Sequence, residues 1–443
     1  MRYDESVRRY AETMTGLCME NNYIPDEKYK ELGVYRGLRD LNGKGVLTGL
    51  TGISEINSFR TIDGERVPID GELWYRGYRV EDLVRKYSTD VFGFEKTTYL
   101  LLFGNLPDEA ESQLFVHMLE EVRTLPGNFV RDVIMKAPTR DIMNSMARSI
   151  LTLSSYDENY MLTDITDEIR KSIMLISTFP MLAIYAYHAY NHYQNLSSMY
   201  IHRPGPQMST AENILAMLRP DQKYTKLEAE VLDVALVLHA EHGGGNNSTF
   251  TTRVVTSSGS DIYSAIAAAM SSLKGPRHGG ANIKVMEMMA DIRAHVTDWN
   301  DKDAIYDYLN KILEGEAFDR KGLIYGMGHA IYSKSDPRER IFREYVGRLA
   351  EDKGRMNELA LYRAIEEIAP VVINDHRKIY KGVSPNIDFY SGFVYDMLGI
   401  PQALYTPLFA VARIAGWCAH RLEEITGKGK IIRPAYQSVM KKR

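Results

Sequence analysis

The chain has 443 residues, of which 44% are hydrophobic and 25% charged, and its formal net charge is −4 at pH 7. This composition is typical of a globular protein, and the length favours two or three domains. The small negative charge argues against a broad basic surface of the kind that binds nucleic acid, so a polyanionic ligand would need a local cluster of cations.

The two cysteines, Cys18 and Cys418, could form at most one disulfide, which indicates a reduced intracellular chain. The N-terminal segment MRYDESVRRYAETM carries acidic residues and no apolar core, unlike a secretory signal or a transit peptide. The longest apolar stretches, 179–187 and 404–419, are too short to span a membrane. We therefore expect a cytoplasmic protein with no membrane or nucleic-acid partner. The chain contains no zinc-binding spacing, and no metal is expected.

In chain order, a short helix is expected at 5–20, and β-branched alternation with turns over 51–78 predicts one or two small hairpins. From Val80 onward, helical periodicity dominates. The predicted helices are 80–87, 94–103, 108–124, 140–155, 167–193, 211–218, 226–239, 281–294, 302–314, 337–352, 357–368, 387–398 and 404–426. The fold class is mainly α, because strands do not alternate with helices and there is no glycine-rich nucleotide loop.

The segment 239–289 contains two histidine-bearing loops of opposite electrostatic character. Gly243 to Gly245 are expected to end a helix at His242, where the negative end of the helix dipole would favour an imidazolium that binds an anion. His278 lies just before a helix that opens near Gly280, so the positive end of that dipole should keep it neutral, as a hydrogen-bond donor. Taken alone, His242 is more simply explained as a helix-end histidine.

Two further residues stand out by their surroundings. Arg413 lies in LFAVARIAGWCAH, where a guanidinium is costly unless a carboxylate from the protein or from a ligand meets it. Asp388 follows Asn386, a possible helix cap; the helix dipole would lower its pKa and burial would raise it, leaving an ionised carboxylate able to accept a proton. A structural ion pair for Arg413 and a structural first-turn aspartate are the alternatives.

A third group lies in loops and in the tail. His329 follows Gly326, Met327 and Gly328, where the small glycines would let a ligand approach the backbone, and Arg338 begins a helix nine residues later. Such glycines are most often turn formers, and Arg433 would ordinarily be taken as tail charge. Together these histidines, arginines and one carboxylate suit acid/base chemistry on a dicarboxylate.

These motifs resemble the citrate synthase family, which also contains 2-methylcitrate synthases. The resemblance runs from about Gly49 to Pro434 through IDGELWYRGYRVEDL, TTYLLLFGNLP, HAEHGGGNNSTF, GPRHGGAN, GMGHAIYSKSDPR, NIDFYSG and LFAVAR. It implies a two-domain helical fold with a small N-terminal hairpin region. The large domain would comprise 1–278 and 397–443, and the smaller, mobile domain 279–396.

The resemblance also implies a reaction, in which acetyl-CoA condenses with oxaloacetate and water to give citrate and CoA through an enol and citryl-CoA. Asp388 would remove the methyl proton, His278 would donate a hydrogen bond to the thioester oxygen, and His329 would polarise the oxaloacetate ketone. The residues implied for oxaloacetate are His242, Asn246, Arg338, Arg413 and Arg433, the last from the other subunit of a homodimer.

Coenzyme A is implied as a co-substrate, with no tightly bound cofactor. Its implied contacts are Leu273, Arg277, Leu323, Gly326, Met327, Gly328 and Lys334, of which Met327 and Lys334 depart from the usual family pattern. Residues 1–45 do not resemble the NADH-binding region of the hexameric bacterial enzymes, which favours a dimer. A 2-methylcitrate synthase that uses propionyl-CoA and a non-catalytic helical relative are the alternatives.

Overall fold

The structure is a computed structural model, and it describes residues 5–40, 45–62, 65–87, 89–328, 331–332, 334–377, 383–427 and 429–440. Within these residues the chain is mainly helical, as predicted, with 17 α-helices and three strands. By its internal contacts the chain divides into two units, which are described separately. One unit comprises 1–50 and 433–443, and the other comprises 51–432.

The first unit contains α1 (Glu5–Asn22) and α2 (Asp26–Glu31), and neither helix buries a side chain. The second unit begins with β1 (Ser54–Ile62), β2 (Glu65–Tyr75) and β3 (Tyr78–Arg79). Its α-helices are α3 (Val80–Lys86), α4 (Gly93–Phe103), α5 (Glu109–Glu121), α6 (Ile142–Leu153), α7 (Ile165–Asn195), α8 (Thr210–Leu218), α9 (Lys226–His239), α10 (Asn247–Ser257), α11 (Ile262–Leu273), α12 (Ala281–His295), α13 (Lys302–Glu314), α14 (Pro337–Asp352), α15 (Met356–Arg377), α16 (Asp388–Met397) and α17 (Tyr405–Thr426). Short turns of other helix types are η1 (Val130–Ile134), η2 (Ser154–Tyr156) and η3 (Gln402–Leu404).

The predicted hairpin region is confirmed. The strands form an antiparallel sheet in the order β1-β2-β3, with Ser54 paired to Tyr75 and Ile62 to Glu65. The alternation of β2 places Leu73 and Tyr75 on one face, and both side chains are buried. The sheet thereby covers one side of the helical core.

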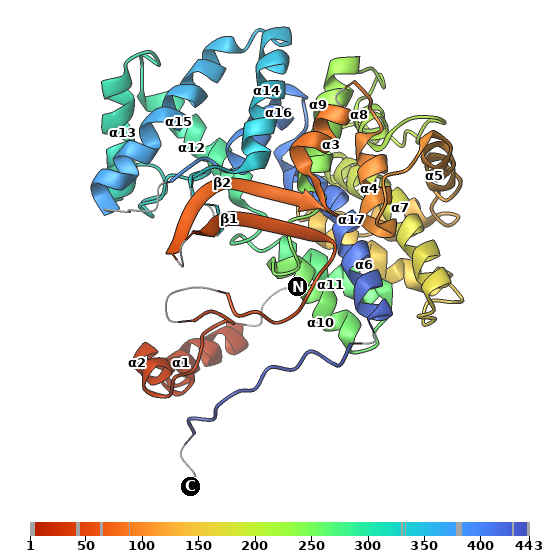
Figure 1. Cartoon of the computed structure of the whole chain (residues 1–443), viewed down its shortest axis with the longest axis horizontal. Coiled ribbons are helices and arrows are strands. Elements are labelled where there is room, and N and C mark those ends of the chain that lie inside the picture. Colours follow the sequence, from red (N-terminus) through yellow and green to blue (C-terminus); the bar gives the residue numbers. More distant parts are fainter. Residues whose placement is uncertain are drawn as a thin grey trace. The chain divides into compact units, whose positions relative to one another are not determined.

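The core of the second unit is built around α17, which packs against α4, α7, α9, α10 and α11. Helices α12 to α16 pack on one another, and α14 also contacts α9 and β2 (Figure 1). The helix α7 is long and apolar enough to cross a membrane, but 83% of its most apolar window is buried inside the protein, as in the core helix of a soluble domain. The proposed boundaries of a small domain at 279 and 396 stay a prediction.

Two helices differ clearly from the sequence prediction. The helix α10 was not predicted, because its sequence NSTFTTRVVTS is rich in β-branched residues of low helix propensity. Asn246 nevertheless caps it by accepting a hydrogen bond from the Thr249 amide. Likewise α15 was expected to end at 368 but continues past Pro370 to Arg377, because Val372 and Ile373 remain packed in the core beyond the proline.

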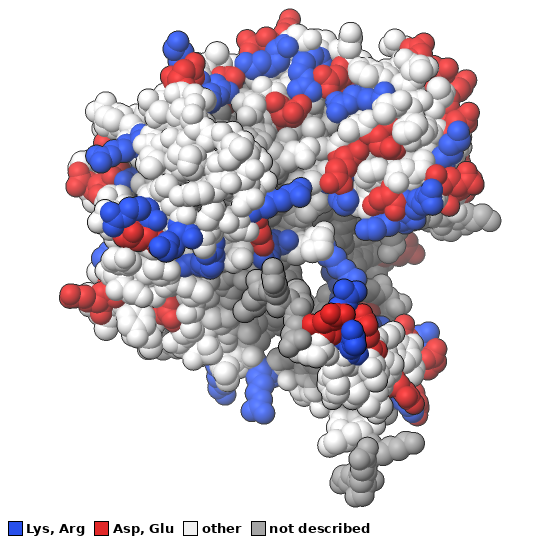
Figure 2. All heavy atoms as spheres, turned by 180° about the vertical axis from the view of Figure 1, so that it is seen from behind, with Lys and Arg blue, Asp and Glu red and all other residues white. Residues whose placement is uncertain are grey.

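The molecular surface carries both signs of charge. Figure 2 shows one face, on which Lys and Arg side chains alternate with Asp and Glu side chains rather than forming one large field. This pattern agrees with the small net charge and directs attention to buried charges.

Candidate active site

The loop between α9 and α10 carries His242, which is only 7% exposed. The predicted helix at 226–239 is confirmed, whereas the expectation that the glycines end it at His242 is wrong, since α9 ends at His239. The reason is tertiary: the Val237 carbonyl accepts a hydrogen bond from the Tyr75 hydroxyl at 3.2 Å, and the His239 carbonyl accepts one from Arg413 Nε at 2.7 Å. These carbonyls bond to other elements instead of extending the helix.

The dipole argument therefore applies to His239, which lies in the last turn of α9. Burial lowers the pKa of His239 to about 3, and its Nδ1 lies 2.8 Å from the Ala235 carbonyl oxygen. Desolvation thus outweighs the favourable dipole, and His239 is neutral at pH 7.

Asn246 fixes the shape of the His242 loop. Its side-chain amide donates to the Gly243 carbonyl at 2.6 Å and to the Thr249 hydroxyl at 2.8 Å. Gly243 has a φ of +83°, and a Cβ there would lie 2.9 Å from Ile56 Cδ1. The predicted supporting role of Asn246 thus has a structural basis in the loop that presents His242.

His278 lies in the turn between α11 and α12, as predicted. Burial lowers its pKa to about 4, and nearby Arg413 lowers it further, so the imidazole is neutral at pH 7. The Ser248 amide donates to its Nε2 at 3.3 Å, and the Ser248 hydroxyl lies 2.9 Å from the same nitrogen. Because an amide can only donate, Nε2 carries a lone pair and the proton lies on Nδ1. His278 is therefore a neutral donor through Nδ1.

Asp388 is the first residue of α16. Its amide donates to the Asn386 side-chain oxygen at 3.0 Å, but the N-cap of the helix is Ile387, so Asn386 closes the turn one residue before the cap instead of capping the helix as predicted. Burial raises the pKa of Asp388 to about 6, against the opposing effect of Arg338 and Arg413. At pH 7 this carboxylate is mostly ionised yet more basic than an ordinary aspartate, which suits a proton acceptor.

The glycine-rich turn 326–328 is paired with the turn before α16. The Gly328 amide donates to the Ser384 carbonyl at 2.8 Å, and the Asn386 amide donates to the Gly326 carbonyl at 2.9 Å. Gly326 has a φ of +80°, and a Cβ there would lie 3.0 Å from Phe389 Cδ2. Glycine is required at this position, and the pairing brings Met327 next to the start of α16.

Arg338 is buried at the start of α14 and is held by a neighbour in the chain. Its Nε and a terminal nitrogen donate to the two oxygens of Asp336 at 3.0 and 2.7 Å. Asp336 also caps the helix by accepting from the Arg338 amide at 3.0 Å. Burial disfavours the guanidinium, but the bidentate contact with Asp336 outweighs it and raises the pKa of Arg338.

Arg413 lies in the middle of α17 and is 1% exposed. Its Nε donates to the His239 carbonyl at 2.7 Å, and its guanidinium carbon lies 4.7 Å from the centroid of the Phe409 ring. No ion pair joins it to a carboxylate of the described residues. Burial lowers the pKa of Arg413 to about 10, so it is still charged at pH 7. The protein carboxylate that the sequence allowed for is not in contact, which leaves a ligand carboxylate as the expected partner.

Two aromatic side chains join these residues into one site. The Tyr332 ring lies 5.6 Å from the His242 ring and 5.9 Å from the Arg338 guanidinium carbon. The Phe409 ring packs against the His278 ring at 6.4 Å and against Arg413. Asp388 interacts electrostatically with Arg338 and Arg413. The structure therefore brings together five of the predicted residues, namely His242, His278, Arg338, Asp388 and Arg413.

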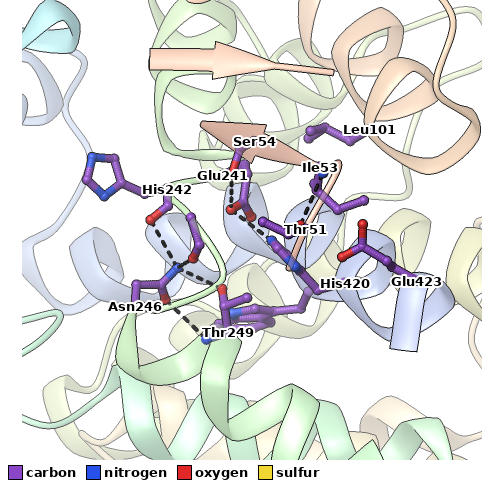
Figure 3. A network of polar contacts seen from close by, with 12 residues as sticks. Thr51, Ile53, Ser54, Leu101, Glu241, His242, Asn246, Thr249, His420 and Glu423 are labelled. Atoms are coloured by element: carbon purple, nitrogen blue, oxygen red, sulfur yellow. Dashed lines mark hydrogen bonds and ion pairs between the residues drawn. The ribbon is translucent and has the colours of Figure 1, made fainter. Parts of the chain in front are cut away.

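The sequence analysis missed a buried polar network behind the site. Glu241 accepts hydrogen bonds from Ser54 at 3.0 Å and from His420 at 2.9 Å, next to His242 in the chain (Figure 3). Arg253 donates to His420 and forms ion pairs with Glu423 and Glu424. The spacing of His420, seven residues after Arg413 on α17, was the available signal, because it places both side chains on one helix face.

Several predicted residues are not placed in this site. His329 lies outside the described residues. Arg433 belongs to the other unit, so its position relative to the site is not described. The coenzyme A contacts also stay predictions: Leu273 is buried, Gly326, Met327 and Gly328 line the paired turn, and Arg277, Leu323 and Lys334 are exposed.

Comparison with known proteins assigns the family. Residues 41–435 match the family described as citrate synthase, C-terminal domain. The chain belongs to the citrate synthase family. Its relatives include the citrate synthase of Haloferax volcanii, which is 36% identical over 87% of this chain and 93% of its own, and 2-methylcitrate synthase 2 of Corynebacterium glutamicum, which is 32% identical over 88% and 92%.

Solved citrate synthase structures share the fold. The enzyme from Pyrobaculum aerophilum has a TM-score of 0.73 at 28% identity and covers 90% of this chain and 91% of its own. The Thermoplasma acidophilum enzyme, in a ternary complex with carboxymethyl coenzyme A and oxaloacetate, has a TM-score of 0.73 at 26% identity and covers 92% and 97%. This member of the family is therefore an enzyme, a transferase that converts acyl groups into alkyl groups on transfer.

Proposed function

We propose that this citrate synthase family enzyme condenses acetyl-CoA with oxaloacetate and water to give citrate and coenzyme A. The observation that carries the proposal is that a basic carboxylate, Asp388, and a neutral imidazole, His278, both interact electrostatically with the buried guanidinium of Arg413. The relative from Thermoplasma acidophilum, crystallised with carboxymethyl coenzyme A and oxaloacetate, supports the same pair of substrates here.

In the proposed first step, Asp388 removes a proton from the methyl group of acetyl-CoA while His278 donates its Nδ1 proton in a hydrogen bond to the thioester oxygen. A thioester methyl is a weak carbon acid, so the developing oxyanion needs a donor, and losing one such donor costs about 2.7–4 kcal/mol in other enzymes. The neutral state of His278 favours an enol over a free enolate. The enol carbon then attacks the oxaloacetate ketone, polarised by His329, and water hydrolyses citryl-CoA.

We assign oxaloacetate to Arg413, Arg338 and His242. Arg413 lacks a contacting carboxylate among the described residues, and His242 and Arg338 both lie against the Tyr332 ring. Two guanidinium groups at separate places can fix a dicarboxylate in one orientation. Coenzyme A is a co-substrate in this proposal, with contacts expected from Leu273, Arg277, the 323–328 segment and Lys334.

The second candidate reaction is 2-methylcitrate synthesis from propionyl-CoA. Relatives of both names match this chain at similar identity, such as 33% for the citrate synthase of Deinococcus radiodurans and 32% for 2-methylcitrate synthase 2 of Corynebacterium glutamicum. One methylene distinguishes the two acyl donors, and a pocket discriminates such a difference by only about 1–3 kcal/mol.

A thiol-release assay tests the proposal. Coenzyme A should appear only when both acetyl-CoA and oxaloacetate are present, and citrate should be the other product. The ratio of kcat/KM for acetyl-CoA to that for propionyl-CoA separates the two candidate reactions. Release of coenzyme A that does not depend on oxaloacetate, or no release with either donor, would refute the condensing function.

The proposal includes a homodimer whose sites are completed by Arg433 of the other subunit. Exposed apolar side chains around η2 and the start of α7, including Tyr156, Met161 and Leu162, offer a surface for self-association. Arg433→Ala and Asp388→Ala should each be nearly inactive, whereas co-expression should restore activity, because one of the two sites in a mixed dimer is intact. No recovery in mixed dimers would place Arg433 outside the partner's site.

A cytoplasmic location also belongs to the proposal. Both cysteines are free thiols, Cys18 on the surface and Cys418 in the core, as expected for a chain in a reducing compartment. Fractionation of the source cells with activity measured in each fraction tests this location.

A further inference from the structure

The carboxylate of Glu241 lies completely buried beside the helix that carries Arg413. Its side chain is 0% exposed, and a Cβ built on Gly416 would lie 2.2 Å from Glu241 Oε2 and 2.5 Å from the Ala240 carbonyl oxygen. Gly416 follows Arg413 by three residues, so the carboxylate lies against the backbone of α17 within about one turn of the Arg413 Cα. Only glycine leaves room for this approach.

Glu241 is ionised. Its Oε1 accepts from the Ser54 hydroxyl and from His420 Nε2, while Oε2 is buried without a hydrogen-bond partner among the described residues (Figure 3). Burial alone would raise the pKa of Glu241, but the hydrogen bond from His420, the positive charge of Arg413 and the hydrogen bond from Ser54 outweigh it and hold the pKa well below its usual value. The carboxylate therefore carries a full charge at pH 7.

The neighbouring side chains do not cancel this charge. Arg253 donates through Nε to His420 Nδ1 at 3.2 Å, and because a guanidinium cannot accept, Nδ1 holds a lone pair and His420 is the neutral Nε2–H tautomer. The charge of Arg253 is itself balanced by Glu423 and Glu424. What remains around the pocket is the negative charge of Glu241 and of Asp388 and the positive charge of Arg413.

The other pocket arginine has its own partner, since Arg338 is paired with Asp336. Glu241 and Arg413 are thus matched charges without an ion pair between them, because the Glu241 oxygens are held by Ser54, His420 and the α17 backbone. The remaining donors of Arg413 stay available to a ligand. Arg413 is also a favourable electrostatic partner of Glu241, and Glu241 is the largest favourable electrostatic partner of Arg413.

We infer that Glu241 is a resident counter-charge for Arg413, which stabilises the buried guanidinium while the pocket is empty and weakens the binding of the oxaloacetate carboxylate that meets it. This inference rests on the proposed function, which assigns oxaloacetate to Arg413. Glu241 acts through Arg413 and is a positioning residue, not a catalytic one. The negative charge of Glu241 stabilises the empty enzyme because it neutralises Arg413. The same charge repels a dianion that enters the pocket, and substrate affinity is therefore lower.

The test is the variant Glu241→Gln in the full-length enzyme. Glutamine keeps the shape and can still accept from Ser54 and His420 through its amide oxygen, while its NH2 group can donate to the Ala240 carbonyl. We expect the thermal midpoint without ligand to fall and the oxaloacetate Kd, measured by calorimetry, to fall as well, on the order of tenfold. A purely structural role for Glu241 predicts lower stability with unchanged or weaker binding.

A matched control is available on the same helix. Glu168 is also fully buried and pairs with Arg421 of α17 at 2.7 and 2.9 Å, but Arg421 lies eight residues beyond Arg413, or about 12 Å along the axis. Glu168→Gln should lower the thermal midpoint without tightening oxaloacetate binding. Glu241→Asp, which retains the charge, should likewise show no tightening.

The outcomes separate the inference from the proposed function. If the unaltered enzyme does not bind oxaloacetate, the proposed function fails. If it binds, but Glu241→Gln binds no more tightly, or Glu168→Gln gains as much, the counter-charge role is overturned. Should Glu241→Gln give no folded protein, Glu241→Met is uncharged and of similar volume, and the same gain in affinity is expected of it.

Discussion

Arg338 and Arg413 are both buried guanidinium groups of one site, but the start of α14 and the middle of α17 hold them in different ways. Arg338 makes a bidentate contact with Asp336, two residues away in the chain, and the pair is part of the helix cap. Arg413 contacts a backbone carbonyl and an aromatic face, and its carboxylate, Glu241, comes from another element and does not touch it.

The two arginines therefore differ in how many of their N–H groups are free to bind a substrate carboxylate. A contacting carboxylate fixes Arg338 strongly but occupies two of its five N–H groups. Arg413 is fixed by a carbonyl and by Phe409, which leaves its terminal nitrogen atoms for a substrate carboxylate. The site thus has one arginine with a resident partner and one whose partner arrives with the substrate.

The largest expected effect comes from removing the carboxylate that faces both arginines. Asp388→Asn keeps the size and the turn but cannot accept the methyl proton, so kcat should fall by about 10²–10⁴. The arginines are unchanged, and oxaloacetate binding measured by calorimetry should therefore be retained. If Asp388→Asn turned over at a tenth of the original rate or faster, Asp388 would not be the base.

A smaller effect, on stability, distinguishes the two arginines directly. In Arg338→Met the buried Asp336 loses its charge partner, which should lower the free energy of unfolding by about 3–5 kcal/mol, measured with urea. Arg413→Met should lower it less, because Glu241 keeps its hydrogen bonds to Ser54 and His420.

A second substitution sharpens this comparison. Adding Glu241→Gln to Arg413→Met should recover stability, because the orphaned charge is removed, whereas adding it to Arg338→Met should not. Equal losses for the two single variants, or equal recovery in both doubles, would mean that the two arginines are compensated in the same way.

The pH dependence of kcat/KM tests the protonation states of Asp388 and His278. Asp388 is active when ionised, and burial raises its pKa from an ordinary 3.8 to about 6, so kcat/KM should fall as the pH drops through 6, about tenfold per unit below it. His278, with a pKa of about 4, stays neutral through this range and adds no second limb above pH 5. A profile flat from pH 8 to 5 would contradict the assigned pKa of Asp388.

Much of the site could be predicted because its candidate residues lie next to turn-forming residues in the sequence. The glycines at 326 and 328, the turn closed by Asn386 and the helix that begins at Ala281 depend on short-range sequence, and these turns place Asp388 and His278. Arg413 stood out because a charge in an apolar helix needs a partner. Local rules of this kind also gave most of the helices and the single hairpin region.

What could not be predicted depends on contacts between distant elements. Helical periodicity placed the end of α9 at His239 and the glycines placed it at His242. The earlier end is decided by Tyr75 and Arg413, more than 160 positions away, which take the Val237 and His239 carbonyls that would otherwise extend the helix. Glu241 lacks a local signal, since its partners Ser54 and His420 come from β1 and α17. The helix α10 forms against the propensity of its residues, because it packs on α11 and α17.

The smallest expected effect concerns the aromatic support of Arg413. Phe409→Leu removes the ring face that lies 4.7 Å from the guanidinium carbon, a contact worth about 0.5–2 kcal/mol, while keeping an apolar side chain of similar reach. Oxaloacetate Kd should rise about twofold to thirtyfold, with little change in the KM for the acyl donor. Phe409→Tyr keeps a π face and should bind nearly as the original enzyme does. If Phe409→Leu left oxaloacetate binding unchanged, the ring would not be what orients Arg413, and the carbonyl of His239 would have to hold it alone.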